Sequence, residues 1–294
     1  MPRIDDLLLD SVIYIYQSTD DAENGEQAGG TGFLVSIQSE VNKEIGYMYA
    51  ITNSHVIKEN STPAIRFNDT QGRVKIINTY ASDWTRHPDK ADMAAICIFG
   101  DLSILKHCCI PTNMFLTEEL INAHNIGPGD DTFMIGRFIQ HDGKQKNLPS
   151  VRFGNISMMP HEKVKQQNGH EQDCFLVESR SLSGFSGSPV FVHINTPFRP
   201  EDKGALKLGG ARGPWLLGID CGHLPIYENL KIRNGNSITD IPNEAAIPKN
   251  LVINTNSGQM TVLPAWKLHD FLFNGVVAEA RKKEESKLTS QIDK

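Results

Sequence analysis

Short apolar runs recur along almost the whole chain and are separated by glycine, asparagine, aspartate and proline. Several runs alternate apolar with polar positions, and most are too short for a helix, which is typical of β-strands. The runs occupy residues 12–16, 31–37, 46–52, 93–98, 132–136, 151–157, 174–178, 189–192 and 215–219. Because no helices alternate regularly with them, the pattern disfavours a doubly wound α/β sheet. We therefore predict an all-β fold, built as a sandwich or as barrels.

The strand-rich part of the chain divides into two halves. Residues 122–131 contain a Gly-Pro-Gly-Asp-Asp sequence, whose turn-forming residues fit a linker. This predicts an N-terminal β-domain over residues 1–121 and a C-terminal β-domain over residues 122–262. Two polar stretches, 193–213 and 223–249, are predicted to be long loops that either shape a substrate cleft or are disordered insertions.

The last segment, residues 263–294, has a different pattern. Apolar residues recur there at helical spacing, and a charged sequence follows from residue 281. The apolar positions are Leu268, Phe271, Leu272 and Val276. We predict a C-terminal helix with one buried face, followed by a charged, solvated tail.

Composition and charge narrow the class of protein. With 39% hydrophobic and 22% charged residues, the chain has the composition of an ordinary soluble globular protein. No apolar run approaches the roughly 18 residues of a membrane-spanning helix. Asp5, Asp6 and Asp10 make the N-terminus unlike a signal peptide. Since the net charge of −6 also disfavours nucleic-acid binding, we expect a cytoplasmic protein that binds neither membranes nor nucleic acids.

Cysteines and potential metal ligands form no recognisable site. The chain has 5 cysteines, an odd number without a C-x-x-C pair, which favours reduced thiols over a disulfide framework or a zinc ribbon. One of these cysteines lies among further potential metal ligands, which are His161, His170, Glu171, Asp173 and Cys174. Their spacing fits no compact site, so we expect no bound metal.

A serine bracketed by glycines is the sharpest chemical signal. It lies in the sequence Ser-Gly-Phe-Ser-Gly-Ser-Pro, which begins at Ser183 and has Ser186 at its centre. Gly184 can adopt dihedral angles that other residues avoid, and Gly187 leaves room for a substrate chain. The backbone amides of Gly184 and Ser186 can then converge on a developing oxyanion, as acyl transfer requires. The alternative is a plain turn before a buried strand.

A histidine and an aspartate elsewhere in the chain could act together with this serine. His55 follows an apolar strand and a few small polar residues, so its ring can face a cleft. Asp92 directly precedes a strand predicted to be buried, where an aspartate can orient a histidine and stabilise its charged form. Asp89, in a turn-like context, is the competing acid. The order His55, Asp92, Ser186 is that of the chymotrypsin triad, and it places the site between the two halves.

Together these motifs resemble the trypsin-like serine peptidases of the chymotrypsin fold, and most of all the protease domain of bacterial HtrA/DegP proteins. The resemblance covers most of the chain. It rests on Gly-Gly-Thr-Gly at 29–32, Thr-Asn-Ser-His at 52–55, Lys-Ala-Asp-Met at 90–93, the stretch 126–136, Gly-Phe-Ser-Gly-Ser-Pro at 184–189 and Leu-Gly-Ile-Asp at 217–220. It implies two six-stranded antiparallel β-barrels followed by a C-terminal helix.

The resemblance also implies a reaction. Ser186 would be the nucleophile, His55 the general base and then acid, and Asp92 the residue that orients His55. Gly184 and Ser186 would form the oxyanion hole. The implied reaction is hydrolysis of peptide bonds in polypeptide substrates through an acyl-enzyme, with no metal or organic cofactor.

Three features depart from the family pattern. Ser188 replaces a glycine, and a small residue is expected to suffice there. Phe185 replaces the aspartate with which secreted digestive enzymes bind a newly cut N-terminus, so we expect no such activation. Residues 263–294 are too few for the PDZ domain that follows the protease in HtrA-type proteins. Regulation is therefore expected to pass through the long loops, a partner protein or homo-oligomerisation.

Substrate specificity leaves several alternatives open. Arg180 at the floor of the pocket would favour an acidic substrate side chain, whereas Asp220 in that pocket would favour a basic one. Cys221, Gly222 and His223 are further pocket candidates. Cys221 also stands where the family often has a small polar residue near the triad acid. Its thiol is either a weak hydrogen-bond partner of that acid or a buried packing group.

Two other functions fit parts of the sequence. An α/β-hydrolase also uses a bracketed serine, and its partner residues would be Asp220 or Asp240 with His269. However, Ser188 replaces the glycine that its serine turn needs, and the helix alternation is missing. The other alternative is a catalytically silent or activator-dependent peptide-binding scaffold on the double-barrel fold, against which an intact triad argues.

Overall fold

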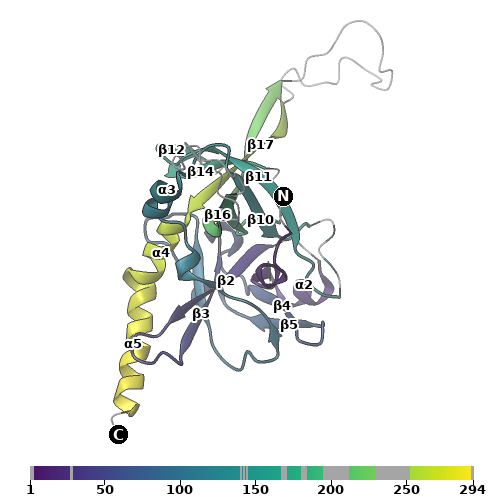
Figure 1. Cartoon of the computed structure of the whole chain (residues 1–294). Coiled ribbons are helices and arrows are strands. Elements are labelled where there is room, and N and C mark those ends of the chain that lie inside the picture. The colour runs from purple at the N-terminus through teal and green to yellow at the C-terminus, as the bar shows by residue number, and fades with distance from the viewer. Residues whose placement is uncertain are drawn as a thin grey trace, which may run out of the picture.

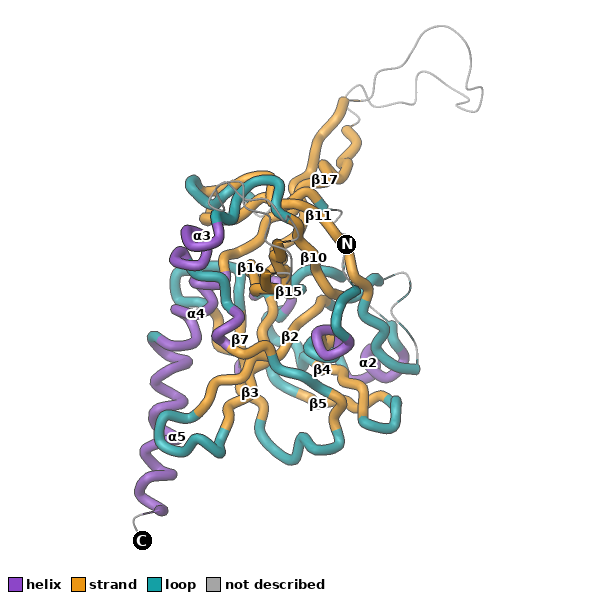
Figure 2. Tube along the Cα trace, viewed as in Figure 1, coloured by secondary structure: helices purple, strands orange, loops and turns teal. Residues whose placement is uncertain are grey.

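The computed structural model describes residues 3–26, 29–139, 141, 143, 145–166, 171–179, 184–194, 212–229 and 252–292. Strands fill the body of the molecule, and the two C-terminal helices run along one side of it (Figure 1; Figure 2). The predicted all-β fold class is confirmed.

The first half of the chain forms one nine-stranded sheet, curved as a half-barrel. Seven strands follow the hydrogen-bonded order β5-β4-β1-β2-β3-β7-β6, while β8 pairs with β4 and β9 pairs with β2. The bounds are β1 Val12–Tyr16, β2 Gly30–Gln38, β3 Gly46–Thr52, β4 Ala64–Asp69, β5 Val74–Asn78, β6 Thr85–Arg86, β7 Ala94–Ile98, β8 Leu105–Lys106 and β9 Ile110–Pro111. The apolar runs at 12–16 and 46–52 coincide with β1 and β3.

This half differs from a closed six-stranded barrel because its edges do not meet. β6 is two residues long and pairs with β7, whereas β5 pairs with β4, so within the described strands no pairing joins β5 to β6. Strands of two residues are too short to appear in an apolar pattern, which is why the sequence did not predict the three shortest ones. Residues such as Ile13, Ile65 and Trp84 fill the core of this half.

The second half forms a closed barrel of six strands in the order β10-β11-β14-β17-β16-β15. The bounds are β10 Asp131–Gly136, β11 Ser150–Met158, β14 Phe175–Glu178, β15 Pro189–Ile194, β16 Arg212–Asn229 and β17 Val252–Pro264. A separate two-stranded sheet consists of β12 (Lys163–Lys165) and β13 (Glu171–Asp173). Phe175, Val190 and Leu217 are fully buried in the barrel core.

Both stretches predicted to be long loops begin or end in strands. His193 belongs to β15, and residues of β16 and β17 pair beyond the barrel as a two-stranded arm that projects from the body (Figure 1). The two strands of this arm hydrogen-bond to each other, which satisfies their backbone groups, so they can form without an apolar sequence. The remainder of the two stretches, 195–211 and 230–249, lies outside the described residues.

The C-terminal segment forms two helices, α4 (Ala265–Phe273) and α5 (Gly275–Ile292). The α4 residues predicted to be buried are Leu268, Phe271 and Leu272, and all three are. Val276 was predicted on the same stripe but is 62% exposed, whereas Val277 is buried. The reason is the break after α4, because a new helix starting at Gly275 shifts the buried stripe by one residue.

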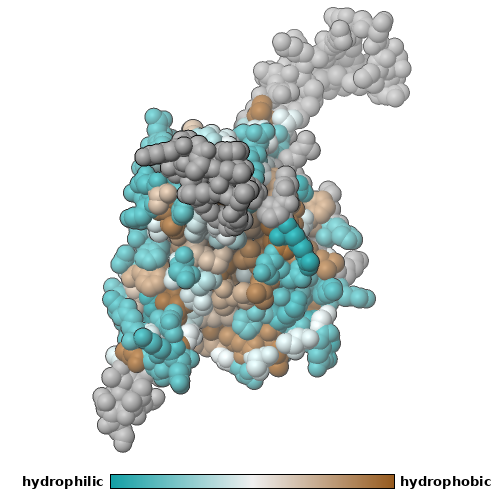
Figure 3. Space-filling model, viewed as in Figure 1, coloured by the Kyte–Doolittle hydropathy of each residue, from teal (hydrophilic) through white to brown (hydrophobic). Residues whose placement is uncertain are grey.

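The charged tail is not wholly solvated, in contrast to the prediction. The Arg281 guanidinium donates to the Leu272 carbonyl at 3.0 Å and to the Tyr49 hydroxyl at 3.4 Å. One turn later, the Glu285 carboxylate accepts a hydrogen bond from the Glu40 amide at 3.0 Å. Both charged side chains are buried on the face of α5 that meets the first half. The other face is charged, and this part of the surface is hydrophilic in Figure 3.

The other helical segments are short. They are α1 Asp6–Leu9, α2 Thr19–Asn24, η1 Ser54–Val56, η2 Ala81–Asp83, η3 Thr112–Met114 and α3 Glu118–His124. None of the helices in the described part of the chain is long and apolar enough to span a membrane.

Candidate active site

His55 lies just after β3, on η1, which is one turn of 3-10 helix. The buried strand ends at Thr52, and the hydroxyl of Ser54 then donates to the Met93 carbonyl at 2.7 Å. This bond fixes the turn against the segment that enters β7. The His55 side chain remains 45% exposed, so the imidazole faces solvent from a rigid support.

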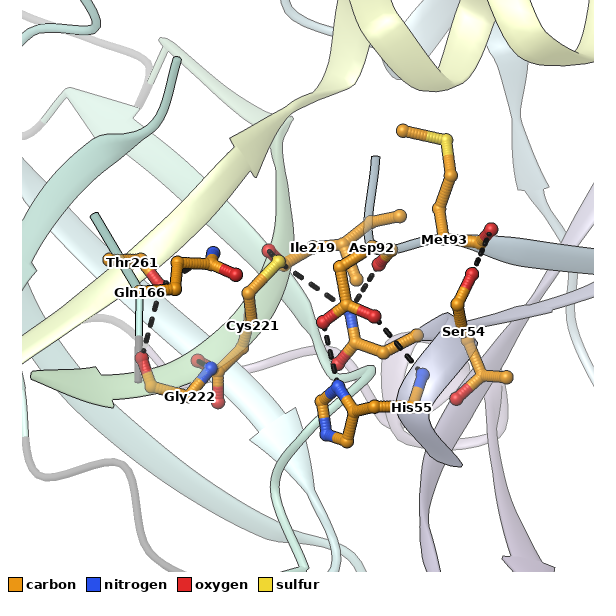
Figure 4. Close-up of polar contacts among 12 residues, drawn as sticks. Ser54, His55, Asp92, Met93, Gln166, Ile219, Cys221, Gly222 and Thr261 are labelled. Atoms are coloured by element: carbon orange, nitrogen blue, oxygen red, sulfur yellow. Dashed lines mark hydrogen bonds and ion pairs between the residues drawn. The ribbon is translucent and has the colours of Figure 1, made fainter. Parts of the chain in front are cut away.

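Asp92 lies before β7 and is held at each of its hydrogen-bonding groups. Its Oδ1 accepts from the His55 amide at 3.1 Å, and its Oδ2 lies 2.7 Å from His55 Nδ1 (Figure 4). Its carbonyl oxygen accepts from Asn53 Nδ2 at 2.8 Å, and its amide donates to Gln172 Oε1 at 3.3 Å. Because an ionised carboxylate only accepts hydrogen bonds, His55 Nδ1 carries a proton, and Nε2 of the neutral ring is left as an acceptor.

The surroundings of His55 raise its pKa. Burial lowers the pKa, but the hydrogen bond and charge of Asp92, with the charge of Asp220, outweigh burial. The net pKa therefore lies above the ordinary value of 6.5. The competing acid, Asp89, is exposed, and its amide donates to His87 Nδ1 at 3.2 Å. Of the two acids, the structure brings Asp92 to His55.

Ser186 lies on a tight turn between two glycines with positive φ. Gly184 has φ +97° and Gly187 has φ +85°, a region that glycine adopts at little cost. Phe185 points into the barrel core, where it is fully buried and the Arg152 guanidinium lies 5.0 Å from the centre of its ring. The turn is thus anchored by an apolar side chain, while Ser186 itself is half-buried.

Thr31, at the start of β2, ties the serine turn to the first half of the chain. Its amide donates to the Ser186 carbonyl at 2.9 Å, and its hydroxyl donates to the Gly184 carbonyl at 2.6 Å. The same hydroxyl accepts from the Arg137 amide at 2.9 Å. The Thr31 carbonyl accepts from the Thr52 hydroxyl at 2.7 Å, at the end of β3. One threonine therefore connects the turn of Ser186 to the strand that carries the histidine.

We predict that Thr31→Val lowers the free energy of unfolding by about 2–4 kcal/mol, because the Gly184 carbonyl and the Arg137 amide both lose a buried partner. Urea denaturation of the full chain measures this. Thr132→Val is the matched control, since among the described residues the buried hydroxyl of Thr132 has no hydrogen-bond partner. That control should change the free energy of unfolding by less than about 1 kcal/mol. Equal effects of the two substitutions would contradict the role given to Thr31.

The turns of Ser186 and His55 approach the same point of β2. A Cβ built on Gly30 would lie 2.6 Å from the side chain of Val56 and 2.9 Å from the Ser186 carbonyl oxygen. Since Val56 follows His55 in η1, both turns lie beside this glycine and close to each other. In the described part of the chain, no hydrogen bond joins the Ser186 hydroxyl to the His55 ring.

Four of the five predicted pocket residues, Asp220 to His223, lie on β16, beside the serine turn. Asp220 is fully buried; its carbonyl accepts from the Gly187 amide and its amide donates to the Ser188 carbonyl, both at 2.9 Å. The Asp220 carboxylate accepts from the Gly222 amide at 2.8 Å. His223 pairs with Met260 across the strands.

Two further pocket candidates have different outcomes. The sulfur of Cys221 receives the Asn53 amide group at 3.5 Å and that of Gln172 at 3.8 Å, so it lies behind Asp92. Arg180 lies outside the described residues.

Asn53 and Gln172 were missed by the sequence reasoning, although both touch Asp92. Asn53 precedes the histidine in a motif that was recognised, so its position was visible but its contact was not. Gln172 is 80 residues from Asp92 in the chain, and nothing local distinguishes it from a solvated glutamine. The contact depends on how β13 packs against the first half, which no local pattern encodes.

The cysteines near the site are not reactive. Burial raises the pKa of the Cys174 thiol to about 12 and that of the Cys221 thiol well above its ordinary value. A protonated thiol is a poor nucleophile. All five cysteines are free, and all lie in the described part of the chain. Of the other residues considered as metal ligands, His170 lies outside it, and the described residues contain no cluster suited to a metal.

Comparison with known proteins agrees with this geometry. The family model of the trypsin-like peptidase domain matches residues 30–195, more than half of the chain. The chain belongs to the trypsin-like peptidase family. The predicted family is thus confirmed, and the matched segment of this trypsin-like peptidase contains His55, Asp92 and Ser186.

Three solved structures illustrate the similarity. Deg5 is 15% identical, with 74% of this chain and 81% of that chain covered and a TM-score of 0.45. The HtrA-type protease AlgW with a decapeptide is 17% identical, with 85% and 53% covered and a TM-score of 0.44, so the peptidase spans about half the length of AlgW. HBP is 9% identical, with 91% and 93% covered and a TM-score of 0.47. A search of curated protein sequences gave no match.

Proposed function

We propose that this trypsin-like peptidase is a serine endopeptidase that hydrolyses polypeptide substrates with His55, Asp92 and Ser186 as its triad. The observation that carries the proposal is the 2.7 Å contact between His55 Nδ1 and the buried Asp92 carboxylate. This contact leaves Nε2 of the neutral ring able to accept a proton. The serine turn and the histidine turn both lie beside Gly30. Nucleophile and base often form their hydrogen bond only when substrate is bound.

The proposed reaction has two steps. In the first, Ser186 Oγ attacks the scissile carbonyl carbon, His55 Nε2 takes the hydroxyl proton, and the amine leaves with that proton. In the second, His55 Nε2 takes a proton from the water that attacks the acyl-enzyme, and it gives this proton to Ser186 Oγ as the bond to the acyl group breaks and the carboxylic acid product leaves. Asp92 stabilises the imidazolium formed in each step, in keeping with the raised pKa of His55.

The amides of Gly184 and Ser186 are proposed to form the oxyanion hole. Among the described residues, neither amide donates to another backbone group. The carbonyl groups of the same two residues are taken by Thr31. The Phe185 carbonyl shares a peptide plane with the Ser186 amide, and it accepts from the Ser188 amide at 2.8 Å. This bond fixes that plane and pre-orients the Ser186 amide for a developing negative charge.

Labelling with a fluorophosphonate tests the proposal. The activated Ser186 oxygen should displace fluoride from phosphorus and form a stable covalent adduct in the wild-type chain. Ser186→Ala and His55→Ala should give no adduct. If the folded wild-type chain stays unlabelled at every pH between 6 and 9, the serine-peptidase proposal is wrong, and the chain is a catalytically silent scaffold or needs an activator.

We predict opposite pH dependences for activity and stability. His55 must be neutral to act as a base, so kcat/KM should rise with pH through the raised pKa, giving an acid limb above pH 6.5. Protonated His55 is favoured in the folded state, so its contribution to stability is full below pH 6.5 and disappears as pH rises through the folded-state pKa. Parallel pH profiles of kcat/KM and of urea denaturation measure both. An acid limb below pH 6 would contradict the prediction.

A further inference from the structure

Two of the four hydrogen-bonding groups of Asp92 are held by side chains outside the proposed triad. The carboxylate binds His55, the carbonyl oxygen accepts from Asn53, and the amide donates to Gln172. Asp92 and Asn53 belong to the first half of the chain. Gln172 belongs to β13, which lies within the sequence of the second half. The aspartate is therefore held from both halves at once.

The amide of Gln172 is oriented by its two partners. Its Oε1 accepts from the Asp92 amide at 3.3 Å, which turns Nε2 toward the Cys221 sulfur at 3.8 Å. The same sulfur receives Asn53 Nδ2 at 3.5 Å. Asn53 and Gln172 thus hold the two ends of the Asp92 backbone and share one acceptor behind it. Gln172 is 4% exposed, so no solvent competes for these bonds.

In this arrangement, Gln172 holds the backbone of Asp92 in place. A buried amide without a partner is costly, so removing the Gln172 oxygen would push the Asp92 backbone to move or rotate. The carboxylate on that backbone is 2.7 Å from His55 Nδ1, and both the strength of that bond and the pKa of His55 depend on its position. A side chain that only filled space would leave the pKa of His55 unchanged.

We infer that Gln172 is a positioning residue that acts through Asp92 on His55. The position of the carboxylate then depends on the two-stranded sheet of β12 and β13, which presents Gln172 to the first half. The effect on catalysis rests on the proposed serine-peptidase function. The effect on the pKa of His55 does not, because it follows from hydrogen bonds present without substrate.

The experiment compares Gln172→Met with Gln166→Met in the full chain. Gln166 lies next to the same two-stranded sheet but binds Thr261 and Cys174, not Asp92. NMR titration gives the pKa of His55, whose signal is assigned by its loss in His55→Gln. We expect Gln172→Met to lower the pKa of His55 and to reduce kcat by about 10- to 100-fold with KM unchanged. Gln166→Met should change neither.

Gln172→Glu is the second variant and covers the case in which the methionine variant does not fold. It keeps an oxygen for the Asp92 amide and adds an acidic group near His55, so the pKa of His55 should be at or above that of the wild type. A pKa of His55 that is the same in wild type and Gln172→Met, or that falls in Gln172→Glu, overturns the inference. If the wild type fails to react with fluorophosphonate, the proposed function fails, while the titration still decides the role of Gln172.

Discussion

Replacing Ser186 with alanine is expected to lower kcat for peptide hydrolysis by on the order of 10⁴-fold or more. The substitution removes the only atom that forms the acyl-enzyme in the proposed mechanism, and it leaves the backbone bonds of the turn in place. Because a triad acts as a unit, His55→Ala combined with Ser186→Ala should be little worse than either change alone. Steady-state kinetics with a fluorogenic peptide pool measure all three variants.

Ser188→Ala is the matched control for that result. Ser188 lies two residues along the same turn, and within the described residues its buried hydroxyl has no hydrogen-bond partner. Its activity should stay within a few-fold of the wild type. If Ser186→Ala retained wild-type kcat, or if the double variant lost the product of the two single effects, the proposed triad would be wrong.

Asp92→Asn should lower kcat near neutral pH by on the order of 10⁴-fold while the chain stays folded. The asparagine would keep an oxygen for the His55 amide, but its NH₂ group would replace the acceptor now 2.7 Å from Nδ1. Nδ1 would then accept, and the ring proton would move to Nε2, where it prevents uptake of the serine proton. The pKa of His55 should also fall, since the hydrogen bond and charge of Asp92 are what raise it against burial.

Asp89→Asn controls for loss of an acid from the same segment. Asp89 is exposed, so its replacement should leave kcat and the pKa of His55 at wild-type values. Kinetics across pH and NMR titration of both variants decide between the two acids. Full activity of Asp92→Asn, or loss of activity in Asp89→Asn, would mean that the orienting acid was misassigned.

The sequence predicted the strands and the family better than it predicted closure of the sheets. Apolar runs placed β1 and β3 correctly because every residue of these strands except Gly46 is buried. The first half stays open because, among the described strands, no pairing joins β5 to the two-residue β6, and strands this short leave no pattern in the sequence. The second half does close as the resemblance implied, with six strands.

The C-terminal helices show a signal that was present but misread. Val277, Arg281 and Glu285 are each four residues apart and share the buried face of α5. Two of these residues are charged, so a search for apolar positions alone passed over them. Arg281 and Glu285 are buried because the Glu40 amide and the Tyr49 hydroxyl of the first half, with the Leu272 carbonyl of α4, offer them partners. That complementarity lies between distant segments and cannot be derived from the helix sequence.

In the proposed site, too, the sequence predicted some residues and missed others. His55, Asp92 and Ser186 could be chosen because each sits at a recognisable strand end and their chain order is informative. Thr31 lies in a quoted motif, yet its bonds to Gly184 and Ser186 reach more than 150 residues along the chain. The groups proposed to react could therefore be predicted from the sequence, whereas the groups that hold them could be found only from the fold.

The bonds of Thr31 also make the serine turn depend on both halves of the chain. The contact between His55 and Asp92 lies within the first half alone. In the proposed mechanism, a chain in which only the first half has folded would therefore carry an oriented histidine without an organised nucleophile.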